Sequence, residues 1–144
     1  MTLPPGVAIR PIHAADDPAM AAVIRTVMPT FGACGSGFAI NDPEVDWMSR
    51  AYAAPRHAYC VGTQDERVLG GAGVAPLQGG DADTCELRKM YFLPEARGIG
   101  AGSAMMAHCL DAARQFGFRR IGQPTGATGH GGCNTFYLLD LTAT

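Results

Sequence analysis

The sequence predicts an α/β fold, more narrowly α+β, with a mixed, mostly antiparallel sheet and flanking helices. Three strand-like segments follow one another with only short polar turns between them, which is typical of an antiparallel meander. A strongly helical segment then separates the last of them from a further strand, and a helical crossover makes two neighbouring strands parallel. Two helical segments precede the meander and can cover the sheet.

The composition predicts one globular domain over residues 1–144. Of the 144 residues, 47% are hydrophobic and 17% are charged, and the formal net charge is −2. A chain of this length can bury one sizeable core. The near-neutral charge offers no basic field for nucleic acid. The apolar runs are too short to span a membrane, so we expect neither nucleic-acid nor membrane partners.

Five cysteines are scattered without a CxxC pair: Cys34, Cys60, Cys85, Cys109 and Cys133. An odd number, in a chain whose N-terminus lacks the pattern of a secretory signal, predicts reduced thiols and a cytoplasmic location. His130 and Cys133 have HxxC spacing. No second pair accompanies them, and structural metal sites usually need three or four ligands, so we expect no metal.

Helix and strand signals give the element order. The elements expected before the meander are a strand at Val7–Ile12, a helix with the apolar body Ala19–Met28 that Pro29 ends, and a second helix between Asp42 and Pro55. The meander strands are Arg56–Gly62, Val68–Leu77 and Thr84–Leu93, and the glycines of the second predict a bulge or a close backbone approach. A helix at Gly100–Phe116, a strand at Phe118–Ile121 and a last helix at Cys133–Leu139 complete the order.

The stretch Glu86–Gly102, read ELRKMYFLPEARGIGAG, is the most informative part of the chain. A strand leads into a glycine-rich turn, and the turn opens a helix. Backbone N–H groups converge in such a turn, and the helix dipole adds partial positive charge, so the stretch predicts an anion site. The alternative is a tight strand-to-helix turn without a ligand.

This stretch resembles the GCN5-related N-acetyltransferase (GNAT) superfamily. Arg97, Gly100 and Gly102 match its Arg/Gln-x-x-Gly-x-Gly/Ala signature, and Met90–Glu95 resembles its strand-then-Pro-Glu approach. A nicotinamide-binding motif would stand near the start of a doubly wound unit, whereas this motif follows a meander. A P-loop would need Gly-Lys-Ser/Thr, which is absent here. The resemblance implies an acetyl-CoA-dependent N-acetyltransferase that acts on a primary amine of a small molecule or a peptide.

The resemblance also implies cofactor-binding residues. The backbone along β-strand residues Met90, Tyr91 and Phe92 is expected to lie beside the pantetheine arm of acetyl-CoA. The following turn is expected to hold the pyrophosphate through Arg97, Gly98, Ile99, Gly100, Ala101 and Gly102. Glycine there lets the backbone approach the phosphates closely.

Acetyl transfer needs a base for the amine and an acid for the leaving thiolate. The resemblance points to Tyr137, on the expected last helix, as the acid. Glu86 is the first candidate base, with an ion pair to Arg88 as its alternative role, and His130 is the second. No cysteine has an evident histidine–acid partner, so we expect direct transfer without an acyl-enzyme.

The sequence gives fewer signals for the site that binds the acceptor amine. Three acids, Asp42, Glu44 and Asp46, could attract a cationic amine, or they could simply stabilise a helix N-terminus. The superfamily commonly continues after the tyrosine helix with a Gly-Phe pair and two strands, and this sequence is expected to lack them. The last predicted strand would then form an exposed edge and favour a homodimer. The alternative function is a non-catalytic acyl-CoA-binding or regulatory module.

Overall fold

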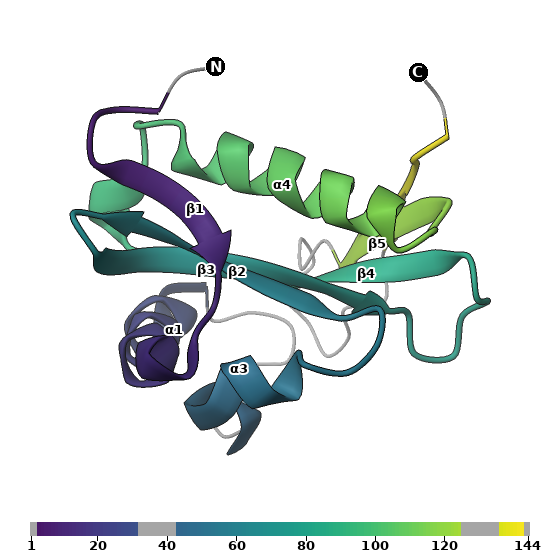
Figure 1. The fold of residues 1–144 in the computed structure, drawn as a ribbon, viewed down its shortest axis with the longest axis horizontal. Helices are drawn as coiled ribbons and strands as arrows, with labels where there is room; N and C mark the ends of the chain where they lie inside the picture. Colours follow the sequence, from purple (N-terminus) through teal and green to yellow (C-terminus); the bar gives the residue numbers. More distant parts are fainter. Residues whose placement is uncertain (1–2, 32–42, 125–135, 143–144) are drawn as a thin grey trace.

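The computed structural model describes residues 3–31, 43–124 and 136–142. A six-stranded sheet with the order β1-β2-β3-β4-β5-β6 forms its centre. Helix α4 covers one face of this sheet, called here the α4 face. Helices α1 and α3 cover the other, called here the α1 face (Figure 1). All neighbouring strands are antiparallel except β4 and β5, so the predicted mixed, mostly antiparallel sheet with flanking helices is confirmed.

The segments before the meander differ in length from the prediction. They are β1 (Val7–Pro11), the 3-10 turn η1 (Ala14–Asp16), α1 (Asp17–Phe31), the 3-10 turn η2 (Pro43–Trp47) and α3 (Met48–Ala51). Helix α1 continues through Pro29, because a proline in the last turn removes only one helical hydrogen bond. The expected second helix is split, since Trp47 leaves helical geometry with φ −143° and ψ 50°.

The predicted meander is confirmed. Its strands are β2 (Ala58–Gln64), β3 (Arg67–Pro76) and β4 (Thr84–Phe92). Asp65 and Glu66 join β2 to β3 with φ of 50° and 72°. Two successive left-handed residues give a two-residue hairpin whose twist matches that of the flanking strands. In the sheet order, β4 lies between β3 and β5 and is therefore an inner strand.

The crossover after β4 also agrees with the prediction. A short 3-10 turn, η3 (Pro94–Ala96), leads to α4 (Ala101–Gln115), and the chain returns as β5 (Arg120–Pro124). Strand β5 lies parallel to β4. None of the helices in the described ranges combines the length and the hydropathy needed to cross a bilayer.

The predicted last helix is wrong where the structure describes it. Phe136–Asp140 forms a strand, β6, which pairs antiparallel with β5 from Arg120↔Asp140 to Pro124↔Phe136. A short apolar run cannot be assigned by periodicity alone, and its aromatic and branched residues also favour a strand. Strand β6 covers β5, so the expected exposed edge at β5, which was the reason given for a homodimer, is wrong too.

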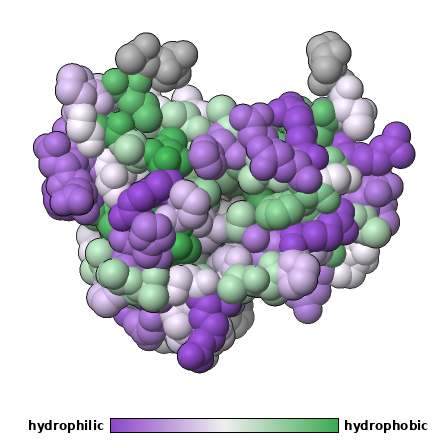
Figure 2. Space-filling model, in the orientation of Figure 1, coloured by the Kyte–Doolittle hydropathy of each residue, from purple (hydrophilic) through white to green (hydrophobic). Residues whose placement is uncertain are grey.

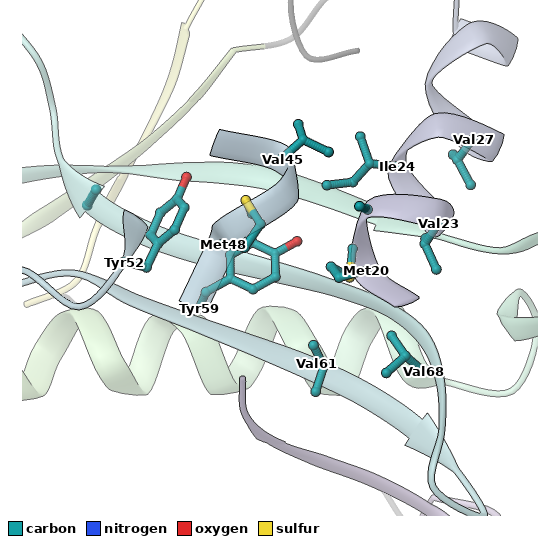
Figure 3. Packing of buried hydrophobic residues seen from close by; sticks show 12 residues of the cluster. Met20, Val23, Ile24, Val27, Val45, Met48, Tyr52, Tyr59, Val61 and Val68 are labelled. Carbon is teal, nitrogen blue, oxygen red and sulfur yellow. The ribbon is translucent and has the colours of Figure 1, made fainter. Parts of the chain in front are cut away.

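Two apolar clusters hold the layers together. Met20, Ile24 and Val27 of α1 pack with Val45 and Met48 against the α1 face (Figure 3). On the α4 face the second cluster consists of Cys60, Ala72, Val74, Cys85, Leu87, Met105, Cys109, Ala113, Phe118, Ile121 and Leu141. Because both faces are covered, β3 is buried along most of its length. The sheet is therefore a rigid platform for side chains at the end of β4.

Candidate functional site

Strands β4 and β5 separate soon after they meet. Three residue pairs join them within the described part of β5, residues 120–124, and Glu86↔Gly122 is the last of these. Beyond Glu86, β4 continues through Leu87–Phe92 past its described pairing with β5. An extended ligand could bond to the backbone on that side of β4 as a strand would.

A bulge shifts β4 directly beyond this point. Gly73 pairs with Arg88 and Gly71 with Tyr91, so Lys89 and Met90 together face Ala72 of β3. Lys89 has φ +48°, a conformation that is uncommon for residues other than glycine. Two residues opposite one is the signature of a β-bulge, which bends a strand and redirects its groups.

Hydrogen-bond alternation shows which backbone groups face the open side of β4. The Leu93 N–H donates to the Leu69 carbonyl at 2.8 Å, which makes these residues a hydrogen-bonded pair. Antiparallel pairs alternate between bonded and non-bonded. The backbone of Tyr91 therefore points to β3 and that of Phe92 points away from it, whereas the bulge interrupts the alternation at Met90. Tyr91 pairs with Gly71 of β3, and its contact with a cofactor stays a prediction.

The turn between η3 and α4 is built on left-handed glycines. Gly98 and Gly100 both have φ +85°, and Gly100 is the N-cap of α4. A Cβ at Gly98 would meet no atom within 4 Å, so glycine is needed there for its backbone and not for space. The first N–H groups of α4 have no partner within the helix. The turn therefore presents donors at the positive end of the helix dipole.

A cleft of about 560 Å³ lies where β4 meets this turn. We call it the β4–α4 cleft. Its lining consists of Met90, Phe92, Ala96, Arg97, Gly98, Gly100, Gly102 and Ser103. Six of the nine cofactor residues predicted from the sequence are in this lining. Tyr91, Ile99 and Ala101 are not, and Ala101 is buried in the helix packing.

Ser103 and Ala96 line the cleft but were not predicted. Ser103 lies in the first turn of α4, where a hydroxyl can supplement backbone donors. Ser103 directly follows Gly102, the last residue of the glycine signature, and this position could have identified it from the sequence. Ala96 closes η3 and is 2% exposed. No sequence pattern distinguishes such an alanine from any other.

Glu86, the predicted base, lies at the point where β4 and β5 separate. Its side chain is 19% exposed, and its Oε1 accepts a hydrogen bond from Nε of Arg88 at 2.9 Å. Arg88 also donates to the Pro76 carbonyl at 3.2 Å. The ion pair between Glu86 and Arg88, which is the alternative role of Glu86, is thus present. It fixes the carboxylate beside the open part of β4.

Tyr137, the predicted acid, lies on strand β6 and not on a helix. It pairs with Gln123, the residue that follows Gly122 on β5. Because Gly122 pairs with Glu86, the backbones carrying the two predicted catalytic residues are two strands apart, at the same level of the sheet. His130, the second candidate base, lies outside the described residues.

Of the three acids predicted to attract an amine, Asp42 lies outside the described residues, and Glu44 and Asp46 are paired. Glu44 of η2 accepts a hydrogen bond from the Lys89 ammonium at the bulge. Asp46 forms a two-bond ion pair with Arg25 of α1, at 2.7 and 2.9 Å. Asp46 therefore joins η2 to α1, whereas Glu44 places a carboxylate beside the bulge.

The described cysteines are buried free thiols. Cys60, Cys85 and Cys109 lie in the cluster on the α4 face. Burial raises the pKa of Cys85 to about 11 and that of Cys109 to about 12. A thiol must be deprotonated to act as a nucleophile, and these are not at neutral pH. Cys34 and Cys133 lie outside the described residues. Within residues 3–31, 43–124 and 136–142, no group of three or more His, Cys, Asp or Glu could hold a metal ion.

Comparison with known proteins agrees with this geometry. A family model described as "Acetyltransferase (GNAT) family" matches residues 24–136. The uncharacterised N-acetyltransferase YjgM of Escherichia coli (strain K12) is 42% identical over 106 residues, which cover 73% of this chain and 64% of that protein. The match therefore spans less than two thirds of that relative's length.

Solved structures show the same fold. A GCN5-related N-acetyltransferase from Kribbella flavida is 27% identical, with a TM-score of 0.65, over 81% of this chain and 70% of that one. A phosphinothricin acetyltransferase from Sinorhizobium meliloti, in complex with acetyl-CoA, is 21% identical, with a TM-score of 0.73, over 85% and 68%. The acetyltransferase yncA from Salmonella typhimurium, with its cofactor acetyl-CoA, is 21% identical, with a TM-score of 0.71, over 82% and 69%. The family model covers most of the chain, and the chain belongs to the acetyltransferase (GNAT) family.

Proposed function

We propose that this chain transfers the acetyl group of acetyl-CoA to a primary amine, on a small molecule or on a peptide or protein, by direct attack of the amine. One observation carries the proposal. The β4–α4 cleft joins the part of β4 that follows its last described pair with β5 to a glycine turn at a helix N-terminus. An elongated ligand with amides at one end and a pyrophosphate at the other is complementary to that combination.

The residues of the cleft fit acetyl-CoA as co-substrate. The pyrophosphate would lie against the N–H groups of Gly98, Gly100 and Gly102, because glycine has no side chain to stand in the way. Arg97, which is exposed, would add positive charge. The pantetheine amides would bond to the open backbone of β4.

The chain's own groups would then serve the transfer. Bound acetyl-CoA supplies an acetyl group activated as a thioester. The Met90 N–H would donate to the acetyl oxygen as negative charge develops there. Glu86 would accept the amine proton, directly or through water, and Tyr137 would protonate the departing sulfur. Buried, protonated Cys85 and Cys109 favour direct transfer over an acyl-enzyme.

We further propose that the chain acts as a single domain in the cytoplasm. The free thiols of Cys60, Cys85 and Cys109 are those of a reducing compartment. Hydrophilic and hydrophobic residues are interspersed on the face of the molecule drawn in Figure 2. That mixture, with a net charge of −2, favours a small-molecule or peptide acceptor over nucleic acid.

Isothermal titration with acetyl-CoA, followed by a thiol-release assay over a panel of amines, tests the function. Saturable binding with turnover of at least one primary amine is expected. Binding without turnover of any amine in the panel would favour a non-catalytic acyl-CoA-binding module. No binding of acetyl-CoA would refute both functions.

A further inference from the structure

Tyr59 of β2 reaches across β3 and holds the bulge of β4. Its side chain is buried, at 3% exposure, and its hydroxyl donates a hydrogen bond of 2.7 Å to the backbone carbonyl of Lys89. Lys89 is the bulge residue with φ +48°. Strand β3 lies between β2 and β4, so this bond joins two strands that are not neighbours.

Two glycines of β3 make room for the tyrosine ring. A Cβ at Gly71 would lie 2.6 Å from Cε1 of Tyr59 and 2.7 Å from the Cys60 carbonyl oxygen. A Cβ at Gly73 would lie 2.6 Å from Cδ2 of Tyr59 and 2.7 Å from the Ala58 carbonyl oxygen. Such contacts are too short for real atoms, so the ring occupies the space that β3 side chains would need. The glycine-rich sequence of β3 thus serves the close approach of one side chain.

The surroundings keep the Tyr59 hydroxyl in place as a donor. Tyr52 packs against its ring with centroids 5.2 Å apart, and Met48 lies beside both rings (Figure 3). Burial raises the pKa of Tyr59 well above its usual value, so the phenol stays protonated. A protonated, immobilised hydroxyl fixes the direction of the Lys89 carbonyl.

The direction of that carbonyl decides where the next N–H points. In a planar trans peptide, the C=O and N–H of one unit point in opposite directions. The unit that carries the Lys89 carbonyl also carries the Met90 N–H. Tyr59 lies on the α1 face, and Met90 packs toward the α4 face and lines the β4–α4 cleft. Holding the carbonyl toward Tyr59 turns the Met90 N–H toward the cleft.

We propose that Tyr59 is a positioning residue for acetyl transfer, which aims the Met90 N–H at the acetyl oxygen through the Lys89 carbonyl. This inference rests on the proposed function. A donor aimed before the substrate arrives stabilises developing negative charge without reorganisation. The hydroxyl itself lies on the other face of the sheet and touches no substrate.

Isotope-edited infrared spectroscopy of the full chain with acetyl-CoA, labelled with carbon-13 at the acetyl carbonyl, tests the inference. A hydrogen bond to a carbonyl lowers its stretching frequency. In the wild-type complex we expect the band below that of free acetyl-CoA. In Tyr59→Phe the carbonyl band should move back toward its frequency in free acetyl-CoA. The affinity for CoA itself should stay within about threefold of wild type, because the glycine turn is untouched. Tyr52→Phe is the matched control. It removes a buried hydroxyl from the same cluster, and that hydroxyl has no hydrogen-bond partner in the described part of the chain.

Each outcome bears on the inference. A band that returns toward the free position in Tyr59→Phe, and stays in place in Tyr52→Phe, supports it. An unchanged band in Tyr59→Phe, an equal shift in both variants, or a wild-type band at the free position overturns it while leaving acetyl-CoA binding intact. Failure of the wild-type chain to bind acetyl-CoA overturns the proposed function together with this inference.

Discussion

Nε of Arg88 lies 2.9 Å from Oε1 of Glu86, at the residue where β4 and β5 make their last pair. The pair joins residues i and i+2, whose side chains share one face of a strand. It holds a carboxylate beside the part of β4 that follows its last described pair with β5, where the acetyl group is proposed to lie. Its chemistry can be tested separately from its structural role.

Glu86→Gln should lower kcat by about 10²-fold, the lower part of the range for loss of a general base, with little change in the affinity for acetyl-CoA. Steady-state kinetics with a saturating amine measures this. Glu95→Gln is the matched control, because Glu95 also pairs with an arginine, Arg67 at 2.7 Å, but lies in η3. Equal rates for Glu86→Gln and wild type would mean that the Glu86 carboxylate has only a structural role.

Gly100→Glu should abolish measurable CoA binding. A side chain and a negative charge would enter the β4–α4 cleft beside the proposed pyrophosphate site. Gly79→Glu is the control, since Gly79 has a similar φ of +80° and lies in the β3–β4 turn. It carries the same backbone strain away from the cleft. Calorimetric titration with CoA should show loss of binding in Gly100→Glu and not in Gly79→Glu. Equal CoA affinities in the two variants would contradict the pyrophosphate assignment.

Tyr137→Phe should lower kcat by about tenfold or more and leave the acetyl-CoA affinity within about threefold, because only the proton donor to the leaving sulfur is lost. Kinetics and titration on the same preparation separate the two quantities. A rate equal to that of wild type would mean that water or another group protonates the thiolate.

Gly71→Ala should destabilise the fold by about 1–3 kcal/mol, the usual cost of overpacking a core. The new methyl group would meet both the Tyr59 ring and the Cys60 carbonyl oxygen. Chemical denaturation measures the loss. Combining Gly71→Ala with Tyr59→Ala removes the ring but not the carbonyl contact, so part of the penalty should remain. No destabilisation in the single variant would contradict the close approach of Tyr59 to β3.

Acid should weaken the N-terminal part of the fold through Asp16. Arg10 binds its carboxylate at 2.7 and 2.9 Å, and this bonding lowers the pKa of Asp16. A lowered folded-state pKa contributes stability that is present above the unfolded pKa of about 4 and is lost as pH falls through the folded value. Asp16→Asn should therefore flatten the decline of the free energy of unfolding below about pH 4.

Asp46→Asn is the matched comparison for Asp16→Asn. Asp46 makes the same two-bond pair with Arg25, but the two side chains are 57% and 43% exposed. Solvent screens such a pair, so its loss should change the free energy of unfolding by less than the loss of the Arg10–Asp16 pair does. Denaturation at several pH values measures both variants. A larger effect from Asp46→Asn than from Asp16→Asn would contradict the assignment.

The sequence predicted those parts of the fold that depend on local signals. The meander, α4 and the glycine turn each carry periodicity or turn residues of their own. Six residues of the cleft, among them Met90 and Gly100, followed from the resemblance that these signals supported. The strand β6 was missed, because a short apolar run becomes a strand only through its pairing with β5.

Features that depend on distant residues could not be predicted. The early separation of β4 from β5 is set by pairing that ends at Glu86. The hydrogen bond from Tyr59 to Lys89 joins residues 30 positions apart. The glycines of β3 signalled a close approach, but nothing local to them identified Tyr59 as the side chain concerned.

Amide hydrogen exchange can show directly whether acetyl-CoA binds in the β4–α4 cleft. Exchange of the wild-type chain, followed by mass spectrometry with and without saturating acetyl-CoA, measures protection peptide by peptide. We expect the largest added protection in peptides spanning residues 88–103, with little change in β1 and α1. Protection confined to other segments, or none at saturation, would contradict it.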